Sequence, residues 1–183
     1  MKKLATVVFA SALFVTPFAD HQADAAAAPS YKAPDLLNTT VAKQLKNDTF
    51  VYKRVDGKAV KIGDTFKTAK YQWGRPSYLS TYSLLGNSSF EAGYGPQPIV
   101  VLKGAAAKYV ENFSYTKVNS YQFYYQNKYS PTAIQKVYGK PTSSSRLNSH
   151  QIEHYYKNLF KVTYEKNNED KWRVRTVIYA KNI

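Results

Sequence analysis

The sequence predicts an α+β protein in which short helices pack on one face of an antiparallel sheet. Three features predict this class: a repeated helix-ending motif, strand-like segments after each copy, and 17 Tyr, 9 Phe and 2 Trp that can fill a core in a chain without cysteine. A short helix followed by antiparallel strands occurs twice, so we expect two tandem repeats, at about residues 60–117 and 118–183.

The repeated motif reads aromatic, Gly, basic, Pro, hydroxyl. Residues 73–77 are Trp-Gly-Arg-Pro-Ser, and residues 138–142, 65 positions later, are Tyr-Gly-Lys-Pro-Thr. Glycine followed closely by proline is typical of a helix end, because glycine adopts the left-handed conformation and proline cannot continue the helix. A match of this length also arises by chance, and the helix signals before both copies favour duplication.

Helix signals precede both copies of the motif. We expect helices at residues 65–71 and 132–137. Ser130 is a suitable N-cap residue, and Pro131 suits the first helical position, where its missing N–H is not needed. Asp64 or Thr65 would cap the first helix in the same way.

Segments rich in β-branched and aromatic residues predict the strands of the sheet. A short strand at 50–52 and a tight turn at Asp56-Gly57 come before the first helix. The remaining strands are expected at 89–94, 99–103, 120–126, 151–156, 159–166 and 172–179.

Residues 1–25 have the pattern of a cleavable export signal. Two lysines precede an apolar run at 4–18, which is shorter than the about 20 residues that span a bilayer. Small residues at 23 and 25 fit signal peptidase, with cleavage after Ala25 or at 26–28. A retained N-terminal anchor is the alternative. We expect a secreted protein, released or held at the cell surface by charge, without membrane insertion.

The rest of the chain is expected to form one folded unit behind a tether. Residues 26–38 are rich in Ala and Pro and predict a flexible leader. Residues 39–183 then suit a single domain made of the two repeats, although the length would also permit two small half-domains.

The charge of the chain indicates what it binds. Lys+Arg is 26 and Asp+Glu is 12, giving a net charge of +14, and loss of residues 1–25 would remove two cations and two anions. A field of this sign favours polyanions such as nucleic acid, wall teichoic acid, anionic glycans or acidic lipid surfaces, without choosing among them. A basic protein that merely tolerates an anionic cell wall is the plainer alternative.

Residues 120–140 resemble the second half of the immunodominant staphylococcal antigen B family. The match is an aromatic strand and a short helix with Ile-Gln-Lys at 134–136 and Tyr-Gly-Lys at 138–140. It covers roughly residues 105–183, and the repeat is also similar to the tandem architecture of β-lactamase-inhibitor-protein-like folds. Membership would imply a secreted, surface-associated, non-enzymatic virulence antigen that binds nucleic acid without sequence preference. The resemblance carries over no binding residues.

Patterns for catalysis are weak. Residues 150–154 read His-Gln-Ile-Glu-His, which matches the inverted zinc-protease motif, but that chemistry needs both histidines on one helical face. The residues downstream favour a strand, in which His150 and His154 share an exposed face and Glu153 points to the other. With no cysteine, glycine-rich phosphate loop or nucleophile elbow, we expect no enzyme, metal or cofactor.

Basic and apolar residues alternate along the predicted last strand. Trp172, Val174, Thr176 and Ile178 are expected to face the core. The opposite face is expected to hold Lys171, Arg173, Arg175, Val177 and Tyr179.

Cations with interleaved tyrosines predict a nucleic-acid site on this sheet face. Such faces hold single-stranded nucleic acid by phosphate neutralisation and by stacking, which contributes about 1–3 kcal/mol per base. A solvated outer face whose lysines prevent aggregation is the alternative. The predicted nucleic-acid-binding residues are Lys157, Lys161, Lys171, Arg173, Arg175, Tyr124 and Tyr155.

A second class of function stays open: a secreted inhibitor or host-interaction module. In that case a rigid sheet would present aromatic residues such as Trp73, Tyr94 and Tyr121 to a host protein. The sequence therefore predicts a non-enzymatic binder of extracellular polyanions, with a protein partner as the alternative.

Overall fold

In the computed structural model, the chain is an α+β protein built on one large antiparallel sheet. The structure describes residues 31–84, 87–95, 97, 99–106, 113–156 and 160–180. The predicted export signal and residues 26–30 lie outside these ranges. Within them, no helix has the length and apolar character needed to cross a bilayer.

The described elements are three helices, one 3-10 turn, a hairpin and an eight-stranded sheet. The helices are α1 (Thr39–Lys46), α2 (Phe66–Trp73) and α3 (Pro131–Tyr138), and the 3-10 turn is η1 (Phe113–Tyr115). The hairpin pairs β1 (Tyr52–Lys53) with β2 (Ala59–Val60). The sheet contains β3 (Tyr78–Leu84), β4 (Asn87–Tyr94), β5 (Val100–Ala106), β6 (Ser120–Tyr124), β7 (Ser143–Asn148), β8 (Gln151–Tyr156), β9 (Phe160–Lys166) and β10 (Trp172–Ala180).

The sheet has the strand order β3-β4-β5-β6-β10-β9-β8-β7, and every neighbouring pair is antiparallel. The chain follows α2 with β3 to β6, and α3 with β7 to β10. The two sets of four strands meet at β6 and β10, where Phe123 pairs with Val177.

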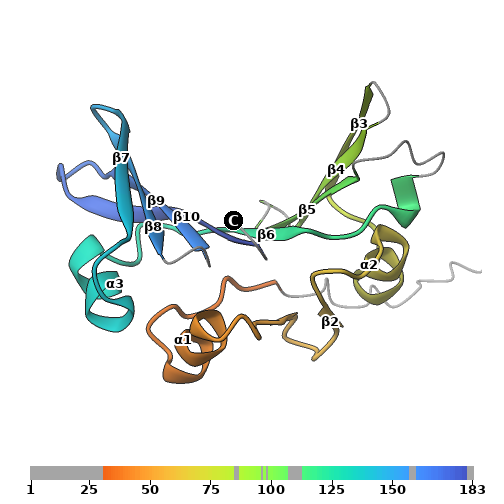
Figure 1. The fold of residues 1–183 in the computed structure, drawn as a ribbon, viewed down its shortest axis with the longest axis horizontal. Coiled ribbons are helices and arrows are strands. Elements are labelled where there is room, and N and C mark those ends of the chain that lie inside the picture. Colours follow the sequence, from red (N-terminus) through yellow and green to blue (C-terminus); the bar gives the residue numbers. More distant parts are fainter. Residues whose placement is uncertain are drawn as a thin grey trace, which may run out of the picture.

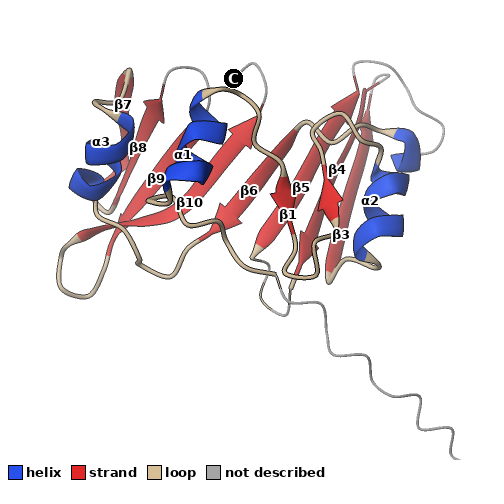
Figure 2. Cartoon of the chain, turned by 90° about the horizontal axis from the view of Figure 1, so that it is seen from below, coloured by secondary structure: helices blue, strands red, loops and turns tan. Residues whose placement is uncertain are grey.

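All three helices lie on one side of the sheet, below it in Figure 1 and in front of it in Figure 2. On the other side, no described helix covers the strands, and β3 and β7 bend away from the helices at the two ends (Figure 1). We call the outer surface of the helices, with the residues just after α3, the helix layer. The uncovered, concave side of the sheet is the open face.

The predicted helix caps are present. The Oγ1 atom of Thr65 accepts a hydrogen bond from the N–H of Thr68 at 3.1 Å, and Oγ of Ser130 accepts one from Ala133 at 3.2 Å. At the other ends, Gly74 and Gly139 have φ of 80° and 85° with extended ψ. Side chains rarely adopt this combination, so the motif needs glycine there, although not in the left-handed helical form that the sequence predicted.

The core lies between the helices and the sheet and is largely aromatic. Phe50, which follows α1, packs edge-on against Tyr121, Phe123 and Tyr179, with ring centroids 6.1, 6.0 and 5.4 Å away. These three residues lie on β6 and β10, so the segment after α1 covers the centre of the sheet.

Residues 31–36, which we call the strap, are packed against the domain. Tyr31 and Leu36 are 8% and 1% exposed. This result corrects the prediction of a flexible leader for that part of residues 26–38. Three tyrosine hydroxyl groups hold the strap by hydrogen bonds to its backbone carbonyls. Tyr52 donates to the carbonyl of Lys32 at 3.1 Å, Tyr125 to that of Pro34 at 2.9 Å and Tyr138 to that of Leu36 at 2.8 Å.

β10 contains a β-bulge at Arg175. Val174 pairs with Tyr164 of β9, but Thr176 pairs with the preceding residue of β9, Thr163. Arg175 is therefore an extra residue on its strand. A bulge of this kind bends the strand and moves every later side chain to the opposite face.

The bulge overturns the predicted faces of the second half of β10. Val177 and Tyr179 lie in the core, 1% and 0% exposed, against the prediction. Thr176 and Ile178, which were expected in the core, pair with Tyr124 and Gln122 of β6 and lie on the open face. The alternation is as predicted only before the bulge.

Candidate polyanion-binding surfaces

The predicted site residues are spread along the open face. Lys161 of β9 and Tyr155 of β8 are direct cross-strand partners, and Arg173 of β10 pairs with Glu165. Tyr124 ends β6 two strands away from Lys161. Arg175 occupies the bulge, and Lys171 is exposed in the turn before β10. Lys157 lies outside the described residues.

Three of the four described cations of the predicted site pair with carboxylates, whereas Arg173 donates to the carbonyl of Trp172 at 3.1 Å. The Nζ of Lys161 lies 2.9 Å from Glu153, and the Nζ of Lys171 lies 3.0 Å from Glu169. The Nε of Arg175 lies 3.4 Å from Glu165. A phosphate at Lys161 or Lys171 would have to compete with these carboxylates, so this part of the predicted cluster is not a free positive surface.

Glu153 organises the centre of the predicted cluster from within the sheet. It is 9% exposed and accepts hydrogen bonds from the hydroxyl groups of Tyr155 and Thr163 at 3.1 and 3.2 Å, besides the ion pair with Lys161. A carboxylate with this many donors is well satisfied. Lys161 and Tyr155 therefore already have Glu153 as their polar partner.

The aromatic residues proposed for a protein partner are buried. Trp73, Tyr94 and Tyr121 are 2%, 1% and 0% exposed and belong to the core. Their positions correct the prediction that they are presented at the surface. Burial raises the pKa of the Tyr94 and Tyr121 phenols well above the usual value.

The two histidines of the zinc-protease-like motif lie in different parts of the β7–β8 hairpin. The predicted strand is present as β8, and His150 lies in the turn before it. His154 faces the helices and is 7% exposed, so the prediction of two exposed histidines is wrong for this residue. Burial lowers its pKa below the usual value. No group of three metal-ligating side chains occurs in the described part of the chain.

The helix layer carries cations of a different kind. Its lysines are exposed, and none lies within ion-pair distance of a carboxylate of the described residues. They are Lys43 and Lys46 of α1, Lys67 and Lys70 of α2, and Lys136 and Lys140 at the end of α3.

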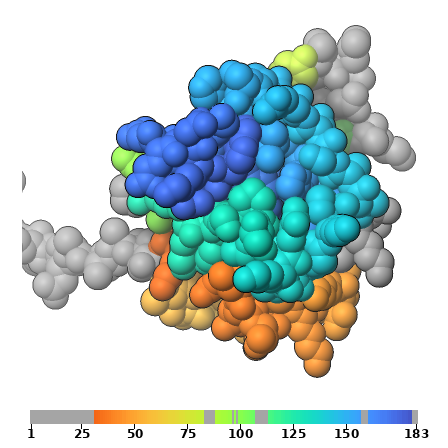
Figure 3. Space-filling view, turned by 90° about the vertical axis from the view of Figure 1, so that its left-hand side faces the viewer, coloured from red at the N-terminus to blue at the C-terminus, as the bar shows by residue number. Residues whose placement is uncertain are grey.

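Lys46 shows that α1 and α3 present their cations together. Its Nζ donates to the carbonyl of Val137 near the end of α3 at 2.7 Å. Figure 3 shows the orange surface that includes α1 directly below the teal surface of α3. Lys46, Lys136 and Lys140 therefore surround the carboxyl end of α3, where cations also suit the helix dipole.

α2 and η1 add exposed aromatic rings to this layer. Tyr71 is 85% exposed and Tyr115 is 57% exposed. The Nζ of Lys67 lies 5.5 Å from the centre of the Tyr115 ring, and Lys70 donates to Ser114 at 3.4 Å. Sequence reasoning missed this cluster, although Lys67, Lys70 and Tyr71 are spaced to share one helical face.

Comparisons with known proteins report only distant likeness. No family model matches the chain, and no curated protein matches it. The uncharacterized protein yfeY from Escherichia coli is 9% identical over 67% of this chain and 92% of that chain, with a TM-score of 0.40. A DUF4309 family protein (YjgB) from Bacillus subtilis is 10% identical over 80% of this chain and all of that chain, with a TM-score of 0.39. At such scores neither likeness carries an argument about function.

Proposed function

We propose that the protein is a secreted, non-enzymatic binder of polyanions that holds nucleic acid without sequence preference through its helix layer. The supporting observation is the distribution of ion pairs: the lysines of α1, α2 and α3 have no carboxylate partners among the described residues, whereas the open-face cations Lys161, Lys171 and Arg175 do. Uncompensated cations bind phosphate backbones by releasing counterions. Teichoic acid offers the same backbone chemistry.

The repeated organisation supports a binding surface with two equivalent parts. Arg75 and Lys140 are exposed and occupy the same place after the two capping glycines. We infer that α2 with β3 to β6 and α3 with β7 to β10 are tandem repeats, each contributing a cationic helix end. The resemblance to the staphylococcal antigen B family points to the same function.

The test is binding of labelled single-stranded DNA and RNA over a series of salt concentrations. We expect the logarithm of the affinity to fall linearly with the logarithm of salt. The double variant Lys136→Gln/Lys140→Gln removes two phosphate contacts, so the slope should decrease by about 1.4, at about 0.7 per contact on a single strand.

The matched control removes the same charge from the other side of the sheet. Lys171→Gln/Arg173→Gln should retain wild-type affinity within about twofold. A protein that shifts neither DNA nor RNA at low salt would disprove the proposal, and equal losses in the two double variants would disprove its assignment to the helix layer.

A protein partner is the second candidate, because the open face is concave and carries partly exposed tyrosines such as Tyr78 and Tyr82, which are 37% and 60% exposed. Capture of a single protein from a host or bacterial extract, unaffected by salt and lost in Tyr82→Ala, would favour this function. Capture that disappears at high salt would not.

A further inference from the structure

A groove of about 1000 Å³ lies at the end of the sheet where β3 and β5 begin and β6 ends. One wall is the strap, and the other is the rim of the open face. The size is within reach of a small organic ligand. The lining residues are Tyr31, Lys32, Ala33, Tyr78, Gln97, Ile99, Val101, Tyr124, Tyr125, Gln126, Lys128 and Arg175.

Two tyrosines of the open face flank the floor of the groove. Tyr78 and Tyr124 are 37% and 36% exposed. Their hydroxyl groups are already engaged, because Tyr78 donates to Glu91 at 3.4 Å and Tyr124 accepts from Gln122 at 2.7 Å. Burial, followed by the charge of Glu91, raises the pKa of Tyr78 to about 12, so this phenol stays protonated. The ring faces are what these residues can offer a ligand.

The floor of the groove beside Tyr78 includes one residue without a side chain. Tyr78 of β3 pairs with Gly93 of β4, which has no side chain, and Gly93 pairs with Val101 of β5. Among the described residues, no aromatic ring packs against Tyr78 or Tyr124. Val101 is 1% exposed, so a flat ring would stack on the exposed parts of the Tyr78 and Tyr124 rings.

The charges that line the groove are all positive. Lys32, Lys128 and Arg175 contribute side chains, and no described carboxylate is among the lining residues. Arg175 contacts Glu165 through its Nε atom, and within the described residues neither terminal nitrogen of its guanidinium group donates a hydrogen bond. A guanidinium group binds phosphate through such paired N–H donors, and lysine adds point charge.

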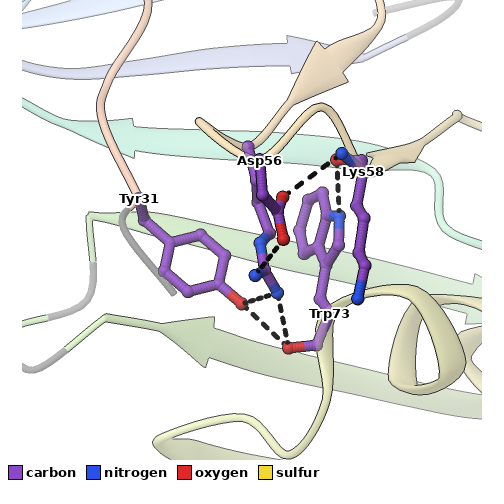
Figure 4. A network of polar contacts seen from close by, with 5 residues as sticks. Tyr31, Asp56, Lys58 and Trp73 are labelled. Carbon is purple, nitrogen blue, oxygen red and sulfur yellow. Dashed lines mark hydrogen bonds and ion pairs between the residues drawn. The ribbon is translucent and has the colours of Figure 1, made fainter. Parts of the chain in front are cut away.

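The strap wall is preorganised. The hydroxyl group of Tyr31 donates to the Trp73 carbonyl at 3.0 Å, and Arg54 donates to the same carbonyl at 3.0 Å while it pairs with Asp56 (Figure 4). Lys58 completes the network by accepting the Trp73 indole N–H at 3.2 Å through its carbonyl. A wall fixed before binding loses less entropy when the ligand arrives.

We propose that the groove binds a nucleoside phosphate, with the base stacked on Tyr78 and Tyr124 and the phosphate at Arg175 and a neighbouring lysine. The inference rests on the proposed function for its class of ligand but uses a different surface. The ligand is either a free nucleotide or the phosphorylated end of a single strand, which present the same chemistry.

The test is calorimetric titration of the protein with adenosine 5′-monophosphate. We expect saturable one-site binding, weakened at least tenfold when the probe is adenosine or inorganic phosphate alone, because each probe retains half of the contacts. Arg175→Gln and Tyr124→Ala should each weaken binding about tenfold, and Arg175→Lys less. Arg173→Gln and Tyr82→Ala are the matched controls and should leave binding unchanged.

Two further arms separate the sources of the ligand and the two proposals. A 5′-phosphorylated deoxyadenosine tetranucleotide that binds more tightly than the monophosphate supports a strand end, and equal or weaker binding supports the free nucleotide. Lys136→Gln/Lys140→Gln should leave monophosphate binding intact. Absence of monophosphate binding, or equal losses in the controls, would overturn the groove assignment while leaving strand binding by the helix layer untouched.

Discussion

The helix layer and the open face both carry cations, but they use them differently. On the open face, Lys161 pairs with the buried Glu153 and Arg175 with the partly exposed Glu165. On the helix layer, Lys46 reaches a backbone carbonyl and the Tyr138 ring, and neither Lys46 nor Lys136 has an ion pair with the described carboxylates. The position of the few carboxylates, rather than the number of lysines, decides where the positive field is free to act.

The two surfaces are therefore expected to use their cations for different purposes. Lys161 on the open face should matter for stability, because its removal leaves the buried Glu153 without its ion-pair partner. Helix-layer cations should matter for binding, because water already solvates them and a polyanion can replace that water. Unfolding measurements can test the expected role in stability.

The largest effect is expected at Arg54, the cation near the helices that does have a carboxylate partner. Its side chain is 7% exposed, pairs with Asp56 and binds the carbonyl of Trp73. Arg54→Gln should lower the free energy of unfolding by about 2–3 kcal/mol, because the donors to both groups are lost. Denaturant titration measures this, and a loss below about 0.5 kcal/mol would show that ion pairing does not separate structural from binding cations.

Lys161 and Lys136 provide a direct contrast between the two surfaces. Lys161→Gln should cost about 1–2 kcal/mol, because it removes the ion pair of Glu153, whose side chain is 11% exposed. Lys136→Gln should change stability by no more than about 0.5 kcal/mol. Both variants are compared by denaturant titration at neutral pH. Equal losses of unfolding free energy in the two variants would contradict the different roles of the open face and the helix layer.

The smallest effect is expected from pH, through the buried His154 on the core side of β8. Burial lowers the pKa of His154 in the folded protein, so the unfolded chain takes up a proton first as the pH falls. Stability should therefore decrease as the pH falls from the ordinary value near 6.5 towards the folded pKa.

His154→Phe should flatten this part of the profile. The measurement is the denaturant midpoint between pH 7 and pH 5, with the interval from pH 7 to pH 8 as the internal reference. An unchanged slope in the variant would mean that other groups set the acid sensitivity.

The sequence predicts most of the elements that have local chemical signals. Ser130 and Pro131 mark the start of α3 because a cap and a fixed φ are properties of single residues. Other elements lack such signals. β7 is exposed at all six positions, so no alternation of apolar residues reveals it. α1 was missed behind an Ala- and Pro-rich stretch, although Asn38 caps it by accepting from Thr40 and Val41.

The candidate site was harder to predict for a related reason. The sequence prediction set Tyr155 beside Lys161 on one sheet face, and the two residues are direct cross-strand partners. Whether a cation is free depends on a partner elsewhere in the chain: Glu153 on β8 pairs with Lys161 on the neighbouring strand β9. Residue type and spacing along one strand contain no information about that contact.

The bulge at Arg175 has a consequence for how the chain tolerates changes of length. It is a single inserted position that separates two phases of alternation on β10. Deletion of one residue there would restore an uninterrupted strand and exchange the sides of Val177 and Tyr179, both 1% exposed or less, with those of Thr176 and Ile178. Because β10 joins the two halves of the sheet, the packing of all eight strands depends on the extra residue at this position.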